Sequence, residues 1–228
     1  MLRITVVTIF PDFFTGPLGL SIPARAAAAG SVSYRIVDLR EYTHDRHRTV
    51  DDYPYGGGAG MVMKPEPFFE AVEALGTQPP IVLLSPRGRR FTQEDALRYA
   101  GLSELTLLCG HYKDVDQRVA DHLATEEISL GDFVISGGEA AALVVIDAVA
   151  RLLPGAISDA ESATTDSFYA AGSGLSAPSY TRPPVYRGHA VPDILMSGDH
   201  AEIARWRAAE AKRLTSERAS DRTTERAR

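Results

Sequence analysis

The sequence has one cysteine, no long apolar run and no hydrophobic leader of the kind that directs secretion. Cys109 follows the apolar residues Leu105–Leu108, which predicts a buried small hydrophobic side chain and excludes a disulfide within the chain. The apolar start of the chain is interrupted by Pro11 and Asp12, too early for a signal peptide, and no run approaches the ~20 residues of a membrane span. We therefore expect a protein of the reducing cytoplasm with no membrane anchor.

Positive charge is also scarce, because 24 Lys and Arg face 30 Asp and Glu and the net charge is −6. An acidic balance taken alone argues against a nucleic-acid partner. The basic residues are unevenly distributed, however, since residues 201–228 hold eight Lys and Arg against five Asp and Glu. A second basic cluster consists of Arg40, His44, Arg46, His47 and Arg48. Each cluster is compatible with phosphate contacts or with an ordinary solvated surface.

The start of the chain alternates between strand and helix patterns. Leu2–Ile9 is apolar and β-branched, the Ala-rich segment Ala24–Ala29 ends at Gly30, and Val32–Leu39 alternates apolar with polar residues. These patterns predict a strand, a helix with a glycine stop and a second strand. A strand–helix–strand order opens a βαβ unit and hence a parallel sheet.

The remaining elements follow the same α/β pattern. Strands are predicted at Ile81–Leu84, Leu105–Cys109 and Ile128–Leu130, with Ser85–Gly88 ending the first of them. Helices are predicted at Pro67–Leu75, Thr92–Ala100, Val115–Leu123, Ala140–Leu153 and Ala201–Leu214. At the start of the predicted helix Thr92–Ala100, Thr92 and Asp95 have the spacing of a capping box.

Three regions differ in composition and suggest the domain organisation. Ala140–Leu153 is apolar nearly all round, so this helix should be buried, within the chain or against a second subunit. Small polar residues dominate the segment that follows, and Thr215–Arg228 has no large apolar residue, so we expect disorder there. The predicted division is an α/β domain over residues 1–156, a flexible linker over 157–177 and a small helical domain over 178–228.

Two glycine-containing turns form the most informative part of the sequence. Gly110–Arg118 and Ser129–Glu139 each follow an apolar or β-branched run and each lead into a predicted helix. Such strand–turn–helix junctions bind ligands in α/β proteins, and glycine lets the backbone approach a flat ligand. The pair Gly137–Gly138 alone is equally typical of a tight turn, but two such turns in succession favour a ligand site.

A long charged segment, residues 40–63, shows little periodicity and carries Gly56–Gly58 and Gly60. No Gly-Lys-Ser/Thr follows, so this is no Walker loop. His44 and His47 lack a cysteine or a third ligand nearby, which disfavours zinc. Long loops of this kind are usually functional or disordered. We interpret the segment as a nucleic-acid contact loop with an adjustable glycine hinge.

These and further segments resemble one known family in the same order along the chain. The matching segments are Thr43–Asp52, Tyr55–Met61, Leu84–Gly88, Gly110–Arg118, Ser129–Glu139, Asp166–Phe168, Tyr180–Pro183 and His200–Ile203. They resemble the bacterial tRNA (guanine-N1)-methyltransferases of TrmD type, in the SPOUT superfamily. The likeness covers about residues 1 to 212, and several of these segments are long and rarely seen elsewhere.

The resemblance implies a fold and a cofactor that the patterns alone do not indicate. It implies a SPOUT-type parallel sheet whose C-terminal part forms a trefoil knot, an arrangement that chain topology otherwise avoids. The knot would gather three loops that hold S-adenosylmethionine in a bent shape, largely through backbone groups. The matching positions are Leu83, Leu84, Ser85, Pro86, Gly110, Tyr112, Ser129, Leu130, Gly131, Ile135, Gly137 and Gly138. We expect Gly138→Val to block cofactor binding and leave the protein folded.

Methyl transfer from a sulfonium is a direct displacement, so the difficulty lies in the acceptor, because guanine N1 must lose its proton. A carboxylate could take that proton, and a guanidinium could stabilise charge at O6. The resemblance assigns these roles to Asp166 and Arg151. From the residues alone, Asp166 is equally a solvated loop residue and Arg151 a helix C-terminal charge favoured by the dipole. The resemblance also implies substrate contacts from Arg46, Arg48, Asp51 and Ser167.

The chain departs from the common family pattern at Lys113 and Asp114, where many relatives have Glu-Gly. That glutamate has been given roles near the methionine end of the cofactor and a magnesium ion. A charged lysine cannot bind a metal, so Mg²⁺ remains a possible cofactor with no assigned ligand.

The expected assembly is a homodimer acting on tRNA, in which the linker aspartate serves the cofactor of the other subunit. The alternatives are another SPOUT RNA methyltransferase and a catalytically silent RNA-binding module.

Overall fold

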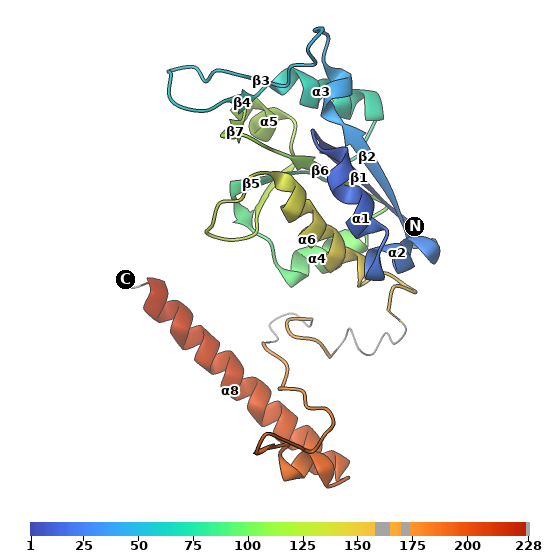
Figure 1. The fold of residues 1–228 in the computed structure, drawn as a ribbon, viewed down its shortest axis with the longest axis vertical. Helices are drawn as coiled ribbons and strands as arrows, with labels where there is room; N and C mark the ends of the chain where they lie inside the picture. The colour runs from blue at the N-terminus through green and yellow to red at the C-terminus, as the bar shows by residue number, and fades with distance from the viewer. Residues whose placement is uncertain (158–164, 170–173, 227–228) are drawn as a thin grey trace. The chain divides into compact units, whose positions relative to one another are not determined.

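The computed structural model describes residues 1–157, 165–169 and 174–226. The chain forms two compact units, Met1–Ala160 and Glu161–Arg228, and each is described by itself. The first unit is built around a parallel sheet (Figure 1) with the strand order β2-β1-β6-β5-β8. Its strands are β1 Leu2–Thr8, β2 Val32–Asp38, β5 Ile81–Arg90, β6 Glu104–Cys109 and β8 Glu126–Ser129. The predicted α/β class and the parallel sheet are confirmed.

Helices cover both faces of this sheet because successive strand side chains point to opposite faces. Val82 and Leu84 of β5 join one buried cluster, whereas Ile81 and Leu83 join another. The first cluster includes residues of η1, α2, α4 and α6, and the second includes residues of η2, α3 and α5. These helices are η1 Pro11–Phe14, α1 Thr15–Leu18, α2 Ser21–Ala28, η2 Leu39–Tyr42, α3 Pro65–Leu75, α4 Gln93–Ala100, α5 Gln117–His122 and α6 Gly138–Ala150.

The helix ends follow local chemistry. Gly76 takes a left-handed conformation with φ of 60° after α3, as glycine at that position commonly does. The predicted capping box of α4 is confirmed, because Thr92 accepts a hydrogen bond from the Asp95 backbone and the Asp95 side chain accepts one in return. Local sequence therefore sets these boundaries to within one or two residues.

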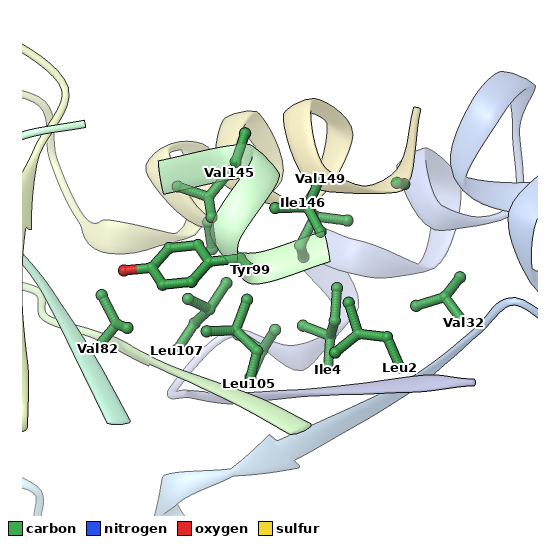
Figure 2. Packing of buried hydrophobic residues seen from close by; sticks show 14 of the residues in the cluster. Leu2, Ile4, Val32, Val82, Tyr99, Leu105, Leu107, Val145, Ile146 and Val149 are labelled. Carbon is green, nitrogen blue, oxygen red and sulfur yellow. The ribbon is translucent and has the colours of Figure 1, made fainter. Parts of the chain in front are cut away.

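Helix α6 is buried mainly within its own chain. Val145, Ile146 and Val149 pack on strand residues of the first cluster, as Figure 2 shows. Its contacts are with α2, α4 and several strands. Val144 is 51% exposed on the outer side of the helix. The apolar character of α6 is thus largely explained by the core, and only a narrow stripe faces outward.

Strand β5 does not end at Leu84, so the prediction that Ser85–Gly88 terminates it is wrong. The strand continues to Arg90, with an irregularity that allows both Leu84 and Arg89 to pair with Ile128 of β8. Gly88 lies at this irregularity, where a Cβ would collide with the backbone of Glu127 and Ile128. The chain therefore crosses β8 closely, which only glycine permits.

The long segment after β2 is partly structured. Two short strands, β3 Asp51–Asp52 and β4 Val62–Met63, pair antiparallel, and β4 pairs parallel with β7 Asp114–Val115. Val50 and Met63 are fully buried. These two anchors fix the ends of the loop between them, which contains Gly56–Gly58 and Gly60.

The second unit contains the hairpin strands β9 Val185–Tyr186 and β10 His189–Ala190, the short helix η3 Asp193–Met196 and the long helix α8 His200–Arg226. The prediction of disorder over Thr215–Arg228 is wrong for the described residues, because α8 continues through them. Arg213 pairs with Glu210 and Glu217 one turn away on either side. Such pairs support a helix without an apolar face.

No described helix of the chain is long and apolar enough to cross a membrane.

Candidate active site

One pocket lies where the strands β6 and β8 end, beside the middle of β5. Three segments line it, residues 83–86, residues 110–115 and residues 128–138 without Asp132, together with Ala141. Their side chains are mostly apolar, and glycine backbone is exposed between them. This is the edge at which open parallel sheets bind ligands.

All twelve residues predicted to bind the cofactor line this pocket. The structure therefore brings together positions that the sequence scatters over more than fifty residues. The pocket also contains residues that were not predicted as ligand contacts: His111, Lys113, Asp114, Val115, Ile128, Phe133, Val134, Ser136 and Ala141. Most lie inside the same glycine-containing segments, and that proximity was the signal available in the sequence.

The two glycine turns contact each other at the pocket floor. The Gly138 N–H donates to the Gly110 carbonyl at 2.7 Å, and His111 and Gly137 form an isolated β-bridge. A Cβ on Gly138 would lie 2.7 Å from the Cys109 Cα. A side chain there would push into β6, so the expectation that Gly138→Val leaves the protein folded is not supported. Glycine is required by packing at this position.

The His111 ring sits between two aromatic rings, with centroids 4.9 Å from Phe10 and 5.2 Å from Tyr112. Its buried Nδ1 has no hydrogen-bond partner among the described residues and lies 3.7 Å from a Glu139 carboxylate oxygen. The buried Glu139 accepts a hydrogen bond from the Thr8 hydroxyl at 2.7 Å. This arrangement ties the end of β1 to the start of α6 behind the pocket.

Tyr112 and Cys109 differ in what they offer the pocket. Tyr112 is 42% exposed and has a φ of 61°, a conformation that residues other than glycine rarely adopt. Such strain often accompanies a functional turn. Burial, followed by the Glu139 carboxylate, raises the pKa of the Cys109 thiol well above its usual value. Cys109 is therefore a neutral packing residue, as its apolar surroundings predict.

The pocket wall does not suit a magnesium ion. Mg²⁺ requires several oxygen ligands in octahedral geometry. Among the described residues that line the pocket, Asp114 supplies the only carboxylate, and Arg87 holds both of its oxygens at 2.7 and 3.0 Å. The neighbouring Lys113 adds positive charge. No group of three His, Cys, Asp or Glu side chains that could share a metal occurs in the described parts of the chain.

Arg151, one of the two residues predicted to be catalytic, lies away from this pocket within the first unit. Arg151 follows the last residue of α6, whereas the pocket is at the first residue. Thirteen helical residues at 1.5 Å each separate the two by roughly 20 Å. Asp166 belongs to the second unit. The structure therefore does not bring Arg151 to the pocket of its own chain.

Asp166, Ser167 and Phe168 form a turn that folds back on residues 174–176. Phe168 has a φ of 66°, and its N–H donates to the Gly174 carbonyl at 2.9 Å. The Ser167 hydroxyl accepts from the Ser176 N–H at 2.9 Å. The Arg218 guanidinium of α8 lies 5.0 Å from the centre of the Phe168 ring. The turn is thus held against α8 within the second unit.

The charged loop before β3 is ordered by Asp45. Its carboxylate accepts from the Thr49 N–H at 2.8 Å, the Thr49 hydroxyl at 2.7 Å and the His47 N–H at 3.0 Å. These bonds, those from Thr49 first, lower the pKa of Asp45. The side chains of Arg46 and Arg48 remain exposed, and Asp51 is half-buried in β3. The two arginines are therefore available for an external anion.

A parallel sheet with a glycine-bordered pocket at its strand ends defines an α/β protein that binds a small ligand there. Comparison with known families makes this assignment specific. Residues 2–225 match the model described as tRNA (Guanine-1)-methyltransferase TrmD, and the chain belongs to that family.

Curated relatives named tRNA (guanine-N(1)-)-methyltransferase agree with this assignment, and three of them illustrate the similarity. The relative from Dehalococcoides mccartyi strain CBDB1 is 51% identical over 224 residues, covering 96% of this chain and 90% of its own. The Shouchella clausii relative is 50% identical and covers 96% and 91%, respectively. The relative from Bacillus cereus strain B4264 is 48% identical over 230 residues and covers 99% and 93%.

Proposed function

We propose that the chain transfers a methyl group from S-adenosylmethionine to N1 of the guanine on the 3′ side of the anticodon in tRNA. The observation that carries this proposal is that all twelve family-matched cofactor positions meet in one pocket. The family and its curated relatives supply the tRNA (guanine-N1)-methyltransferase activity. As a tRNA-modifying enzyme it would act in the cytoplasm.

The composition of the pocket suits the proposed cofactor. Leu84, Leu130 and Ile135 offer apolar surface to the adenine ring, and the turns at Gly110 and Gly137 offer backbone N–H and C=O groups to its edge. The threading of these three segments into a trefoil knot belongs to the same proposal. The contact between Gly138 and Gly110 supports it, because it closes one glycine turn onto the other.

The separation between Arg151 and the pocket favours a shared active site. If Arg151 acts on the reacting base, it must do so at the cofactor of a second copy of the chain. The exposed stripe of α6 around Val144 would lie in such an interface. We propose a homodimer in which Arg151 and Asp166 of one subunit serve the pocket of its partner.

In this scheme the reaction needs only a base and a cation. As the methyl leaves the sulfonium and bonds to guanine N1, Asp166 takes the N1 proton and the Arg151 guanidinium stabilises the charge that develops at O6. The products are S-adenosylhomocysteine, the methylated guanine and a protonated carboxyl. Arg46, Arg48, Asp51 and Ser167 would hold the tRNA around the target base.

The test is incubation with labelled S-adenosylmethionine and unmodified tRNA transcripts, followed by mapping of the label. Methylation at N1 of the expected guanine supports the proposal. Label at another nucleotide or on a ribose would identify a different RNA methyltransferase. Absence of transfer with intact RNA binding would identify a silent binding module.

Asp166→Asn should lower turnover by about 10²-fold or more, the usual loss for a general base. Binding of S-adenosylmethionine should stay unchanged. A mixed dimer with a second chain whose cofactor binding is weakened, Ile135→Asp, sharpens the test at a cofactor concentration too low to occupy the weakened pocket, because Ile135 lines the pocket and is 43% exposed, so its substitution should leave the fold intact. In the hybrid, the Ile135→Asp chain donates its intact Asp166 to the other chain's intact pocket, so activity should partly return. No recovery after proven subunit exchange would contradict the shared site.

A further inference from the structure

Thr215 of α8 anchors the segment that returns from the Asp166–Phe168 turn. Its hydroxyl donates to the Ala211 carbonyl one helical turn earlier at 2.7 Å and accepts from the Leu175 N–H at 2.9 Å. The first bond uses the only hydrogen of the hydroxyl, which leaves its lone pairs for the neighbouring segment. Gly174 lies so close that an added Cβ would collide with the Thr215 side chain. The returning segment is therefore seated directly on α8 at this residue.

The segment seated on Thr215, residues 174–176, also holds the turn that carries Asp166. The carbonyl of its first residue accepts from the Phe168 N–H at 2.9 Å, and the N–H of its last residue donates to the Ser167 hydroxyl at 2.9 Å. The bond to Thr215 lies between these two. The turn is therefore connected to α8 by hydrogen bonds of three consecutive residues.

A second contact reaches the turn from the next helical turn of α8. The Arg218 guanidinium lies 5.0 Å from the centre of the Phe168 ring, which is the distance of a cation–π contact. Arg218 follows Thr215 by three residues, so the two lie on the same side of the helix. Phe168 has a φ of 66°, a conformation that persists only where surrounding contacts impose it. Both α8 residues thus act on a strained part of the backbone.

The position of Asp166 matters for the proposed chemistry. A general base works when its carboxylate is within hydrogen-bond reach of the proton that it removes. A displacement of about 1 Å can cost about a hundredfold in rate. A helix holds a side chain more precisely than a loop does, and α8 is the helix against which this turn is fastened.

We propose that α8 positions the catalytic base. Thr215 and Arg218 hold the Asp166–Phe168 turn in the conformation that presents the Asp166 carboxylate to the target guanine. The inference rests on the proposed function, in which Asp166 removes the N1 proton. Thr215 and Arg218 are positioning residues, because they act through Asp166 and not on the tRNA or the cofactor.

The test is methyl transfer at saturating tRNA and S-adenosylmethionine. Thr215→Val keeps the shape of the side chain and removes the hydroxyl, so turnover should fall by about five- to tenfold, the usual effect of one hydrogen bond. The KM values for both substrates should stay unchanged. Thr215→Ser keeps the hydroxyl and should restore most of the turnover. Unchanged turnover in Thr215→Val, or a rise in KM alone, would overturn the proposal.

A double-mutant cycle separates positioning from general structural support. In an Asp166→Asn background, Thr215→Val should cause no further loss, because Thr215 acts through the carboxylate that is already missing. Arg218→Met should show the same dependence on Asp166. Losses of equal size in both backgrounds would overturn the proposal. If Arg218→Met raised only the KM for tRNA, the guanidinium would face an RNA phosphate, and its assigned role would be wrong.

Ser216→Ala is the matched control for Thr215→Val. The Ser216 hydroxyl makes the same kind of bond within the helix, to the Lys212 carbonyl at 2.9 Å, at an exposed position. Turnover should stay unchanged, and a loss as large as that of Thr215→Val would show that only helix stability matters.

Gly174→Ala provides an independent variant, because its Cβ displaces the returning segment from Thr215. Turnover should fall while circular dichroism shows an intact helix content, and full activity would contradict the proposal. Absence of methyl transfer to tRNA by folded wild-type protein would instead remove the proposed function itself.

Discussion

Two regions that share the strands β5 and β8 are held in shape by different kinds of interaction. In the middle of β5, Leu84 and Ser85 contribute to the pocket, where glycine turns and backbone contacts dominate. Further along the same strand, Arg89 enters a cluster of charged side chains with Asp95 and Glu126. The pocket is therefore shaped by the main chain, whereas the second region is held together by ionic side chains.

The ionic cluster is dense and well satisfied. Arg89 contacts the Asp95 carboxylate at 2.8 and 2.6 Å, and Arg98 contacts the Glu126 carboxylate at 2.7 and 2.6 Å. The Tyr99 hydroxyl donates to Glu126 at 3.0 Å. Asp95 is only 5% exposed. This cluster links β5, α4 and β8.

The difference predicts different responses to substitution and to pH. A region built from backbone contacts should be destabilised when a side chain is added where none fits, and its contribution to stability should depend little on pH. An ionic cluster should fail when one charge is removed, because the remaining buried charges lose their partners. It should also weaken as its carboxylates become protonated.

The largest expected effect is at the pocket floor. Gly138→Ala places a Cβ 2.7 Å from the Cys109 Cα, and we expect a loss of about 3 kcal/mol of stability, since backbone on one side cannot move aside. Chemical denaturation measures it. Gly16→Ala is the control, because a Cβ there meets nothing within 4 Å. Equal stability of the two variants would show that the close approach of the turns is not needed.

Asp95→Asn should cost about 2 kcal/mol at neutral pH. Burial alone would raise the pKa of Asp95, but hydrogen bonds from Arg89 and Thr92 lower it to about 2, against a usual value of 3.8. Because the pKa of Asp95 is lowered in the folded state, the ionised carboxylate contributes its full stabilisation above about pH 4. This contribution is lost as the pH falls through about 2.

The wild type should therefore lose more stability than Asp95→Asn between pH 4 and 2, as followed by denaturation at each pH. Substitution of Asp12 by Asn, at an exposed carboxylate in η1, provides the control. Parallel pH curves for wild type and Asp95→Asn would contradict the role of the cluster.

Unlike the substitutions at Gly138 and Asp95, substitution of an exposed pocket side chain should change ligand binding rather than stability. Ile135→Asp should weaken S-adenosylmethionine binding by about tenfold or more, because a charge replaces apolar surface in the part of the pocket proposed to hold the adenine. Stability should stay nearly unchanged, since Ile135 is 43% exposed. Titration and thermal unfolding test the two parts separately. Leu20→Asp, at a side chain that is 67% exposed and outside the pocket, should change neither quantity.

The smallest effect is expected for the ion pairs of α8. Arg213 pairs with Glu210 and Glu217, but exposed pairs of this kind contribute less than about 0.5 kcal/mol each. Arg213→Met should therefore change stability far less than Arg98→Met in the cluster. Thermal unfolding of the two variants provides the comparison, and similar losses would show that burial is not what makes the cluster strong.

Much of the first unit follows from local sequence. The alternating apolar residues of β1 and β2, the capping box of Thr92 and the glycine stop at Gly30 after α2 were readable because each depends on residues a few positions apart. The glycine turns indicated the ligand pocket for the same reason. Family resemblance added the twelve pocket positions, which no periodicity distinguishes from other loop residues.

Tertiary structure decided the features that join distant segments. The continuation of β5 past Pro86 depends on a β8 partner some forty residues later. Packing also decided why Gly138 must be glycine. The sequence by itself thus determined the elements and the kind of site. Contacts between segments that are remote in the chain decided the walls, the charges and the strained turns of that site, because these contacts form only once the sheet has assembled.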